Sequence, residues 1–301
     1  MAALIPCPRR PAQDQAQVQD QAQAQAEAGS ASPFRAAVHR RPGDLAAGLS
    51  GDFHAQVRTR DTVRVLIGDA RGSGPQAAAT AAAVVHAFHA HAADLDLIAL
   101  AQRLDATIAH RARFGGTDPE LHDAPELHDA AERSNVAERH EDFATALLIE
   151  LDLTGPGLRM INRGHPAPLL VTPHSAFPLS PPEPRPPLGL ADLADGRDEV
   201  WETELAPDTT LLLMTDGVTE ARDRDGTFYD PIARLTGSIP TTASTASTSL
   251  VRRLRRDIKR HTAGRPRDDL MIVALSRGPE PTAHPDRRPR PRAQPMPKRW
   301  Q

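Results

Sequence analysis

Apolar residues along the chain form a pattern that predicts one mixed domain between two polar ends. Short runs rich in Val, Leu and Ile are typical of buried strands. Such runs lie at residues 62–67, 143–153, 158–162, 169–171, 200–205, 210–215 and 270–275. Helical spacing or an Ala-rich composition instead predicts helices over residues 74–91, 95–114 and 250–261, the last with a strongly basic face. This order favours α+β layering over regular βαβ winding.

The two ends of the chain lack any apolar pattern. Within residues 1–32, the stretch 13–28 alternates Gln and Ala with a few acids, and residues 277–301 are rich in Pro and Arg. Segments of this kind cannot bury enough apolar surface to offset the entropy lost on ordering. We therefore expect disordered ends around a single domain at residues 33–276. The basic tail is either solvated or an electrostatic tether for an anionic partner.

A polar segment interrupts the domain at residues 115–142. It contains the direct repeat ELHDA, which begins at Glu120 and again at Glu126. Its His and Asp side chains could serve as metal ligands, but their spacing matches no established site. We expect an inserted polar loop.

Composition excludes several classes of protein. With 39% hydrophobic and 3% aromatic residues, the core must be aliphatic, and a formal charge of -3 gives no general attraction to nucleic acid or membrane. The single cysteine, Cys7, excludes an internal disulfide framework and a cysteine-based zinc site. No stretch reaches the roughly 18 apolar residues that span a bilayer, and residues 1–12 lack the apolar core of a signal peptide. We expect a cytoplasmic protein.

Four short acidic motifs lie beside predicted strands, each within a turn signal. They contain Asp52 after Gly51, Asp69 in GDARGSG, Asp216 in TDGVTE, and the pair Asp268 and Asp269 before the last strand. A carboxylate in such a place can point into a cleft while the neighbouring carbonyl stays available, and Mg²⁺ and Mn²⁺ prefer oxygen ligands. Taken singly, each motif is also a routine turn or helix cap. Each motif by itself therefore leaves both readings open.

In combination, the motifs resemble the SpoIIE-like branch of the metal-dependent (type 2C, or PPM) protein serine/threonine phosphatases. The resemblance spans roughly residues 34–276 and includes, in the family's order, GDARGSG, FATALLIELD, NRGHPAPLL, PPLGL, LLLMTDGVTEARD and DDLMIVAL. It implies a four-layer α/β/β/α sandwich with two central antiparallel sheets. It also implies hydrolysis of phosphoserine or phosphothreonine on a regulatory protein, typically an anti-sigma-factor antagonist.

The same resemblance implies a site for two Mn²⁺ or Mg²⁺ ions. It assigns metal binding to Asp52, Asp69, the carbonyl of Ala70, Asp216 and Asp268. Asp69 would bridge both ions, Asp69 and Asp216 would carry catalysis, and Asp269 is the alternative to Asp268. Clustered carboxylates repel one another unless a dication lies between them. Two such ions can ionise a water at neutral pH, so that no protein nucleophile is needed.

The first motif departs from the family's pattern of Gly-Gly-Asp, an aromatic residue, Tyr and an acid. Ser50, His54 and Ala55 stand at the places of the first glycine, the tyrosine and the acid. These changes bear on local geometry and metal affinity. They favour an alternative function, a pseudophosphatase that binds a phosphorylated partner without hydrolysing it, whereas the retention of all four metal-binding aspartates argues against that alternative.

Further residues and classes stay open. His165 could assist the leaving group or only stabilise a turn, and Arg71 could contact phosphate or pair with an acid. An aspartyl-nucleophile phosphatase would need a second acid where Val218 stands. Nucleic-acid binding through the basic helix at 250–261 lacks interleaved aromatic residues. We expect neither a nucleic-acid nor a membrane partner, and a homodimer stays open.

Overall fold

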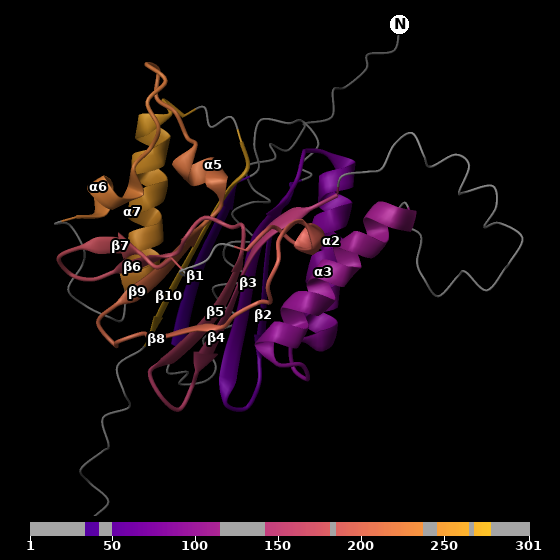
Figure 1. Cartoon of the computed structure of the whole chain (residues 1–301). Helices are drawn as coiled ribbons and strands as arrows, with labels where there is room; N and C mark the ends of the chain where they lie inside the picture. The colour runs from indigo at the N-terminus through magenta and orange to yellow at the C-terminus, as the bar shows by residue number, and fades with distance from the viewer. Residues whose placement is uncertain are drawn as a thin grey trace, which may run out of the picture.

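The computed structural model describes residues 34–41, 50–114, 142–180, 185–236, 246–264 and 268–277. Two five-stranded antiparallel sheets lie at the centre, and helices cover both outer sides (Figure 1). The predicted four-layer sandwich is confirmed. The predicted disordered lead at residues 1–32, nearly all of the inserted loop at 115–142 and nearly all of the tail at 277–301 lie outside the described residues.

Each sheet is built from strands that are far apart in the chain. The first has the order β1-β10-β9-β6-β7. Its strands are β1 (Phe34–Arg41), β10 (Leu270–Arg277), β9 (Thr210–Met214), β6 (Leu169–Val171) and β7 (Ala176–Pro178). The second has the order β2-β3-β4-β5-β8. Its strands are β2 (Asp52–Arg58), β3 (Thr62–Ala70), β4 (Ala144–Asp152), β5 (Gly157–Arg163) and β8 (Trp201–Glu204).

The apolar pattern predicted seven of these strands but not β1, β2 or β7. All three lie at a sheet edge. An edge strand is covered on fewer sides, so its sequence carries more polar residues and a weaker pattern. The sequence of β1, FRAAVHRR, shows this directly.

Side chains between the two sheets form the central core. Val65 and Ile67 of β3 pack there with Leu213 and Val273 of the first sheet, all fully buried. Leu66 points to the opposite side, where it packs with the helices. Burial on both faces explains why β3 reads as a continuous apolar run rather than an alternating one.

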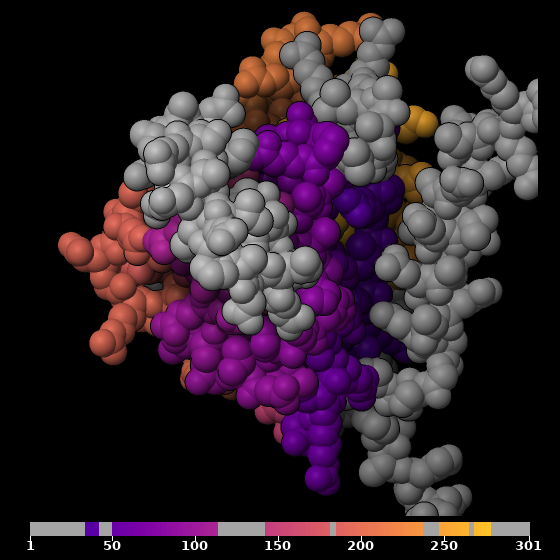
Figure 2. Space-filling model, turned by 90° about the vertical axis from the view of Figure 1, so that its right-hand side faces the viewer, coloured from indigo at the N-terminus to yellow at the C-terminus, as the bar shows by residue number. Residues whose placement is uncertain are grey.

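Helices α2 (Pro75–His91) and α3 (Leu97–Phe114) cover the outer face of the second sheet, on the side that Figure 2 shows. Helices α5 (Asp216–Thr219), α6 (Pro231–Leu235) and α7 (Ala246–His261) lie on the side of the first sheet (Figure 1). A short 3-10 turn, η3, spans Ala191–Leu193. Among the described segments, every helix is too short or too polar to cross a membrane.

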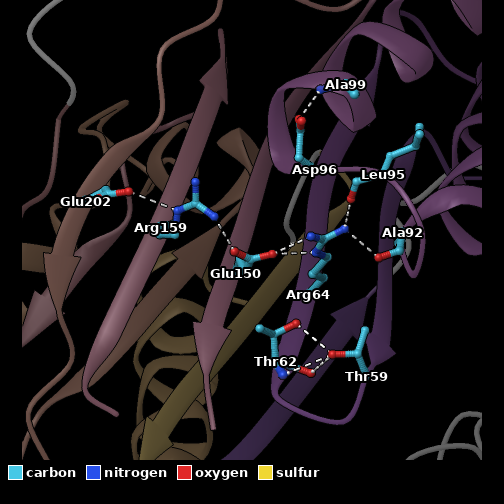
Figure 3. Close-up of polar contacts among 10 residues, drawn as sticks. All are labelled: Thr59, Thr62, Arg64, Ala92, Leu95, Asp96, Ala99, Glu150, Arg159 and Glu202. Carbon is cyan, nitrogen blue, oxygen red and sulfur yellow. Dashed lines mark hydrogen bonds and ion pairs between the residues drawn. The ribbon is translucent and has the colours of Figure 1, made fainter. Parts of the chain in front are cut away.

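A ladder of alternating charges crosses the helix-covered face of the second sheet (Figure 3). Its members lie directly opposite one another on four strands: Arg64, Glu150, Arg159 and Glu202. Glu150 lies between two guanidinium groups, 2.6 Å from Arg64 Nη2 and 2.7 Å from Arg159 Nη1. Arg64 also donates to the carbonyls of Ala92 and Leu95. The ladder therefore ties the turn between α2 and α3 to the sheet.

A buried arginine fixes the loop that follows β7. Arg163, only 1% exposed, donates to Asp198 at 3.1 Å, to Asp105 of α3 at 2.6 Å and to the carbonyl of Pro186 at 2.8 Å. Asp105 also accepts a hydrogen bond from the backbone of Gly189. The arginine thus joins α3, the end of β5 and the PPLGL segment.

Candidate functional site

The acidic residues of the four sequence motifs lie at one end of the two sheets. Asp52 begins β2 and lies directly opposite Asp69 in β3. Asp216 is the first residue of α5, directly after β9, and Asp268 and Asp269 come just before β10. Because β9 and β10 are neighbours, their two motifs meet at this end. Asp52 is almost fully buried, at 2% exposure, and Asp69 and Asp216 are half-buried.

Thr215 connects the two sheets at this end. Its hydroxyl donates to Asp52 Oδ2 at 3.0 Å and accepts from the backbone N–H of Met271 at 3.0 Å. Thr215 precedes α5, yet its side chain makes no capping hydrogen bond. The sequence motif alone assigned Thr215 no role. Only the fold shows that its partner is an aspartate 163 residues away.

Gly51 lies against two oxygen atoms of the candidate metal ligands. A Cβ atom at Gly51 would be 2.7 Å from the carbonyl oxygen of Ala70 and 2.8 Å from Asp69 Oδ1. These two oxygens therefore lie on the same side of Gly51, next to each other, and a larger residue would displace them. This glycine has a role that its motif alone did not reveal.

Gly217 plays a similar part on the first sheet. A Cβ atom there would lie 1.8 Å from the carbonyl oxygen of Asp269 and 3.6 Å from Asp268 Cβ. The backbone of the Asp268 and Asp269 pair therefore packs directly on the first turn of α5. This close approach brings both acids beside Asp216.

Burial, and then mutual repulsion, raises the pKa values of these acids. Burial above all, and then the nearby Asp69 carboxylate, raises the pKa of Asp52 to about 8, although the Thr215 hydrogen bond opposes the shift. Burial, followed by Asp216 and Asp268, raises the pKa of Asp69 to about 7. The pKa of Asp216 is raised by burial and then by Asp268. These groups form one electrostatic cluster, although they come from four separate motifs.

The donor atoms of this cluster suit a hard cation. They are carboxylate and carbonyl oxygens, which Mg²⁺ and Mn²⁺ prefer, and a dication would offset both the burial of negative charge and the repulsion that raise these pKa values. The residues gathered here therefore fit the ions that the sequence motifs imply. The side chains are not closed around a single point, however. Within the described ranges, no three His, Cys, Asp or Glu side chains lie close enough together to hold an ion.

The other polar residues of the motifs have mainly structural contacts. His165 is buried beside Thr145, whose hydroxyl lies 3.0 Å from His165 Nδ1, and burial lowers the pKa of His165 to about 3. Its backbone exchanges hydrogen bonds with the Asn162 side chain, as expected of a turn histidine. A neutral, buried imidazole does not favour the alternative role as a proton donor. The guanidinium of Arg71 stacks 5.2 Å from the centre of the Phe143 ring.

The departures in the first motif lie on β2. His54 is largely enclosed, and burial lowers its pKa to about 4. Its Nε2 atom has no hydrogen-bond partner in the part of the chain that the structure describes. Ser50 accepts a hydrogen bond from the backbone N–H of Asp52 at 3.2 Å. The serine therefore helps to hold the start of β2 where the family has a glycine.

Comparisons with solved structures show the fold. The RsbU and RsbW domains of a Mycobacterium tuberculosis protein are 21% identical, with a TM-score of 0.59, and the alignment covers 81% of this chain and 60% of that one. The phosphatase domain and a regulatory fragment of SpoIIE from Bacillus subtilis are 14% identical, with a TM-score of 0.60 and coverages of 81% and 64%. RsbX in complex with magnesium is 14% identical, with a TM-score of 0.55 and coverages of 81% and 96%. The chain spans less than two thirds of the first two structures.

Sequence comparisons show the family. No curated protein sequence matches the chain. The family profile described as stage II sporulation protein E (SpoIIE) matches residues 59–278, which include Asp69, Asp216 and Asp268, whereas Asp52 lies before the matched region. Because this match covers well over half of the chain and the structure has the two-sheet PP2C sandwich, the chain belongs to the SpoIIE family of PP2C-type (PPM) serine/threonine phosphatase domains.

Proposed function

We propose that this chain is an active, metal-dependent protein phosphatase that hydrolyses phosphoserine or phosphothreonine on a regulatory protein. The observation that carries the proposal is the gathering of acids from both sheets at one end of the sandwich. Asp52 and Asp69 come from the second sheet, and Asp216 and Asp268 from the first. Their pKa values, raised by burial and then by one another, are those of a site built to receive positive charge.

Each residue has a distinct part in the proposal. Asp69, with the Ala70 carbonyl beside it, would hold both ions, and Asp52 would be oriented by its hydrogen bond from Thr215. Asp216 and Asp268 would complete the ligand set from the first sheet. When bound, two Mn²⁺ or Mg²⁺ ions would supply an ionised water and positive charge for the phosphoryl oxygens.

The substrate class is proposed from the proteins that the chain resembles in structure and sequence. Its structural neighbours include RsbU and RsbW domains and RsbX, and the family profile is that of a sporulation phosphatase. We infer that the substrate is a phosphorylated anti-sigma-factor antagonist of a partner-switching system. Such a substrate presents its phosphate on a protein surface, where it can approach the half-buried Asp69 and Asp216 at the end of the sheets.

The test compares turnover with metal binding in the same preparations. The wild type should hydrolyse p-nitrophenyl phosphate with Mn²⁺ and lose this activity in EDTA. Asp69→Asn and Asp216→Asn should each lower kcat by about 10³-fold or more, on the order of 4 kcal/mol of transition-state stabilisation. Both variants should also lose Mn²⁺ binding in calorimetry. Asp61→Asn is the control, because this exposed acid lies just before the start of β3, at the end of the strand opposite Asp69.

A second candidate function is the pseudophosphatase. Two observations favour it: the altered first motif with His54 and Ala55, and the lack of a closed metal-binding group within the described residues. It requires a wild type that neither binds Mn²⁺ nor turns over substrate, while a phosphorylated partner still binds. Full activity in EDTA would contradict both candidates, because it would show chemistry that needs no metal.

A further inference from the structure

The outer face of α7 carries an unbroken stripe of cations. Arg252, Arg255, Arg256 and Lys259, here called the α7 basic face, are all exposed. Their spacing places them on one side of the helix over about 10 Å of its length. The opposite side, with Leu254 and Ile258, is buried in the core of the first sheet.

Stability of the fold does not explain this stripe. Like charges four residues apart, such as Arg252 and Arg256, repel each other and disfavour the helix. No member of the α7 basic face has an acidic partner among the described residues. The only acid of α7, Asp257, is engaged elsewhere, since it pairs with Arg260 at 2.9 Å and accepts from the hydroxyl of Tyr229 at 2.9 Å.

The C-terminal end of α7 lies at the same end of the molecule as the acidic cluster. Gly264, just after α7, accepts a hydrogen bond from Arg41, which lies directly opposite Leu270 at the start of β10. His261 contacts the carbonyl of Thr227 in the loop that follows α5. Figure 1 shows α7 on the outer side of β1 and β10, with α5 near its C-terminal end. The stripe therefore runs towards the end of the sheets that holds Asp216.

The surface along this stripe is hollowed. Arg252, Arg256 and Lys259 line a shallow, open hollow of about 870 Å³, whose described lining comes only from α7 and from Ala263 and Gly264 just after it. An extended peptide segment could lie there with its side chains against the guanidinium groups. Arg forms paired hydrogen bonds with carboxylates, so aspartate and glutamate are the side chains that this hollow would select.

The chemistry of the face favours an acidic protein segment over two other anions. A single-stranded nucleic acid binds most strongly where aromatic side chains stack on its bases, and the stripe contains none. A surface helix binds a membrane most stably when its apolar side inserts, but the apolar side of α7 is already buried in the core. Exposed large hydrophobic residues in the described part of the chain lie on other elements: Phe177, Leu193 and Phe228.

We propose that the α7 basic face docks an acidic segment of the phosphoprotein substrate and orients its phosphate towards the acidic cluster. Docking of an acidic segment needs positive charge, whereas metal binding needs the negative charge of the acidic cluster. The fold places the two charged surfaces towards the same end of the molecule. An acidic partner is repelled by the carboxylates of the site itself, and the cations beside the site offset this repulsion. The partner's identity as the substrate rests on the proposed function, whereas the docking does not.

The test uses two peptides and one pair of variants. One fluorescent peptide carries a phosphoserine between runs of Asp and Glu, and the second has Asn and Gln in their place. The wild type should bind the acidic peptide at least about tenfold more tightly in EDTA, and hydrolyse it with a correspondingly higher kcat/KM in Mn²⁺. The double variant Arg252→Glu/Arg256→Glu should lose this preference while it hydrolyses p-nitrophenyl phosphate as the wild type does.

A matched control changes the net charge equally elsewhere. Arg60→Glu/Arg197→Glu replaces two exposed arginines outside α7 and should keep the preference. Equal binding of both peptides by the wild type, or an unchanged preference in the α7 variant, would overturn the proposal. So would tighter binding through α7 of a single-stranded DNA oligonucleotide or of phosphatidylserine vesicles. Peptide binding without any hydrolysis by the wild type would refute the phosphatase assignment and leave the docking intact.

Discussion

Glu150 offers a direct test of whether the charge ladder on the second sheet stabilises the fold. Its side chain is 7% exposed and lies between Arg64 and Arg159 (Figure 3). Glu150→Gln keeps the size of the side chain but removes its charge, and leaves Arg64, itself 11% exposed, with an uncompensated charge. Breaking a buried pair in this way costs about 3–5 kcal/mol.

We expect a loss near the lower end, about 3 kcal/mol of unfolding free energy. Arg64 keeps its two hydrogen bonds to the carbonyls of Ala92 and Leu95, so its charge is not left wholly unsatisfied. In a domain of this size, such a loss lowers Tm by about 6–12 °C. Urea unfolding followed by circular dichroism would measure the free energy directly.

The same ladder contains its own control. Glu202 also pairs with Arg159, at 3.1 Å, but its side chain is 68% exposed. Glu202→Gln should therefore cost no more than about 1 kcal/mol. Equal losses for the two variants, or a loss below about 1 kcal/mol for Glu150→Gln, would refute the argument from burial. Glu150 lies about 17 Å along β4 from the position opposite Asp69, so turnover well below Tm should not change.

Three further predictions follow from the site and its supports. In metal-free buffer, Asp52→Asn should raise Tm by an amount that grows as pH rises from 3.8 to about 8. With its raised pKa, Asp52 loses its proton at a cost to the fold over this range, whereas Asn stays neutral, so a difference in Tm that is constant with pH would contradict the argument. Gly217→Ala should abolish turnover and lower Tm, since the added Cβ would meet the carbonyl oxygen of Asp269 at 1.8 Å. Wild-type kinetics in this variant would show that the close packing at Gly217 is dispensable. Arg163→Met should destabilise the chain by about 3 kcal/mol in urea unfolding, because buried Asp198 then keeps only its longer contact with Arg185 at 3.9 Å, and Arg163→Met/Asp198→Asn should recover part of the loss.

Local pattern was enough for the central strands and the long helices. A run such as that of β3 is apolar at nearly every position because it is buried on both faces, and this can be recognised without any tertiary information. The basic and apolar sides of α7 were equally visible from spacing. Three of the four edge strands were missed, because partial exposure weakens the pattern there, and the fourth, β8, was predicted.

The sequence by itself determined which residues are candidates for chemistry. The motifs around Asp52, Asp69, Asp216 and Asp268 mark the acids, and their order along the chain carries the family resemblance. The sequence could not show how these acids are arranged relative to one another. Turn signals are local, and each of these motifs is equally compatible with an ordinary turn.

Only the tertiary structure decided that these acids form one cluster and how they are supported. The Thr215 hydroxyl reaches Asp52 across the chain, and Gly51 lies against oxygens of Asp69 and Ala70 because strand pairing brings them together. The raised pKa values likewise depend on burial and on neighbours from other strands. Such properties arise from contacts between residues that are distant in sequence, and no local pattern encodes a distance between two strands that meet only after folding.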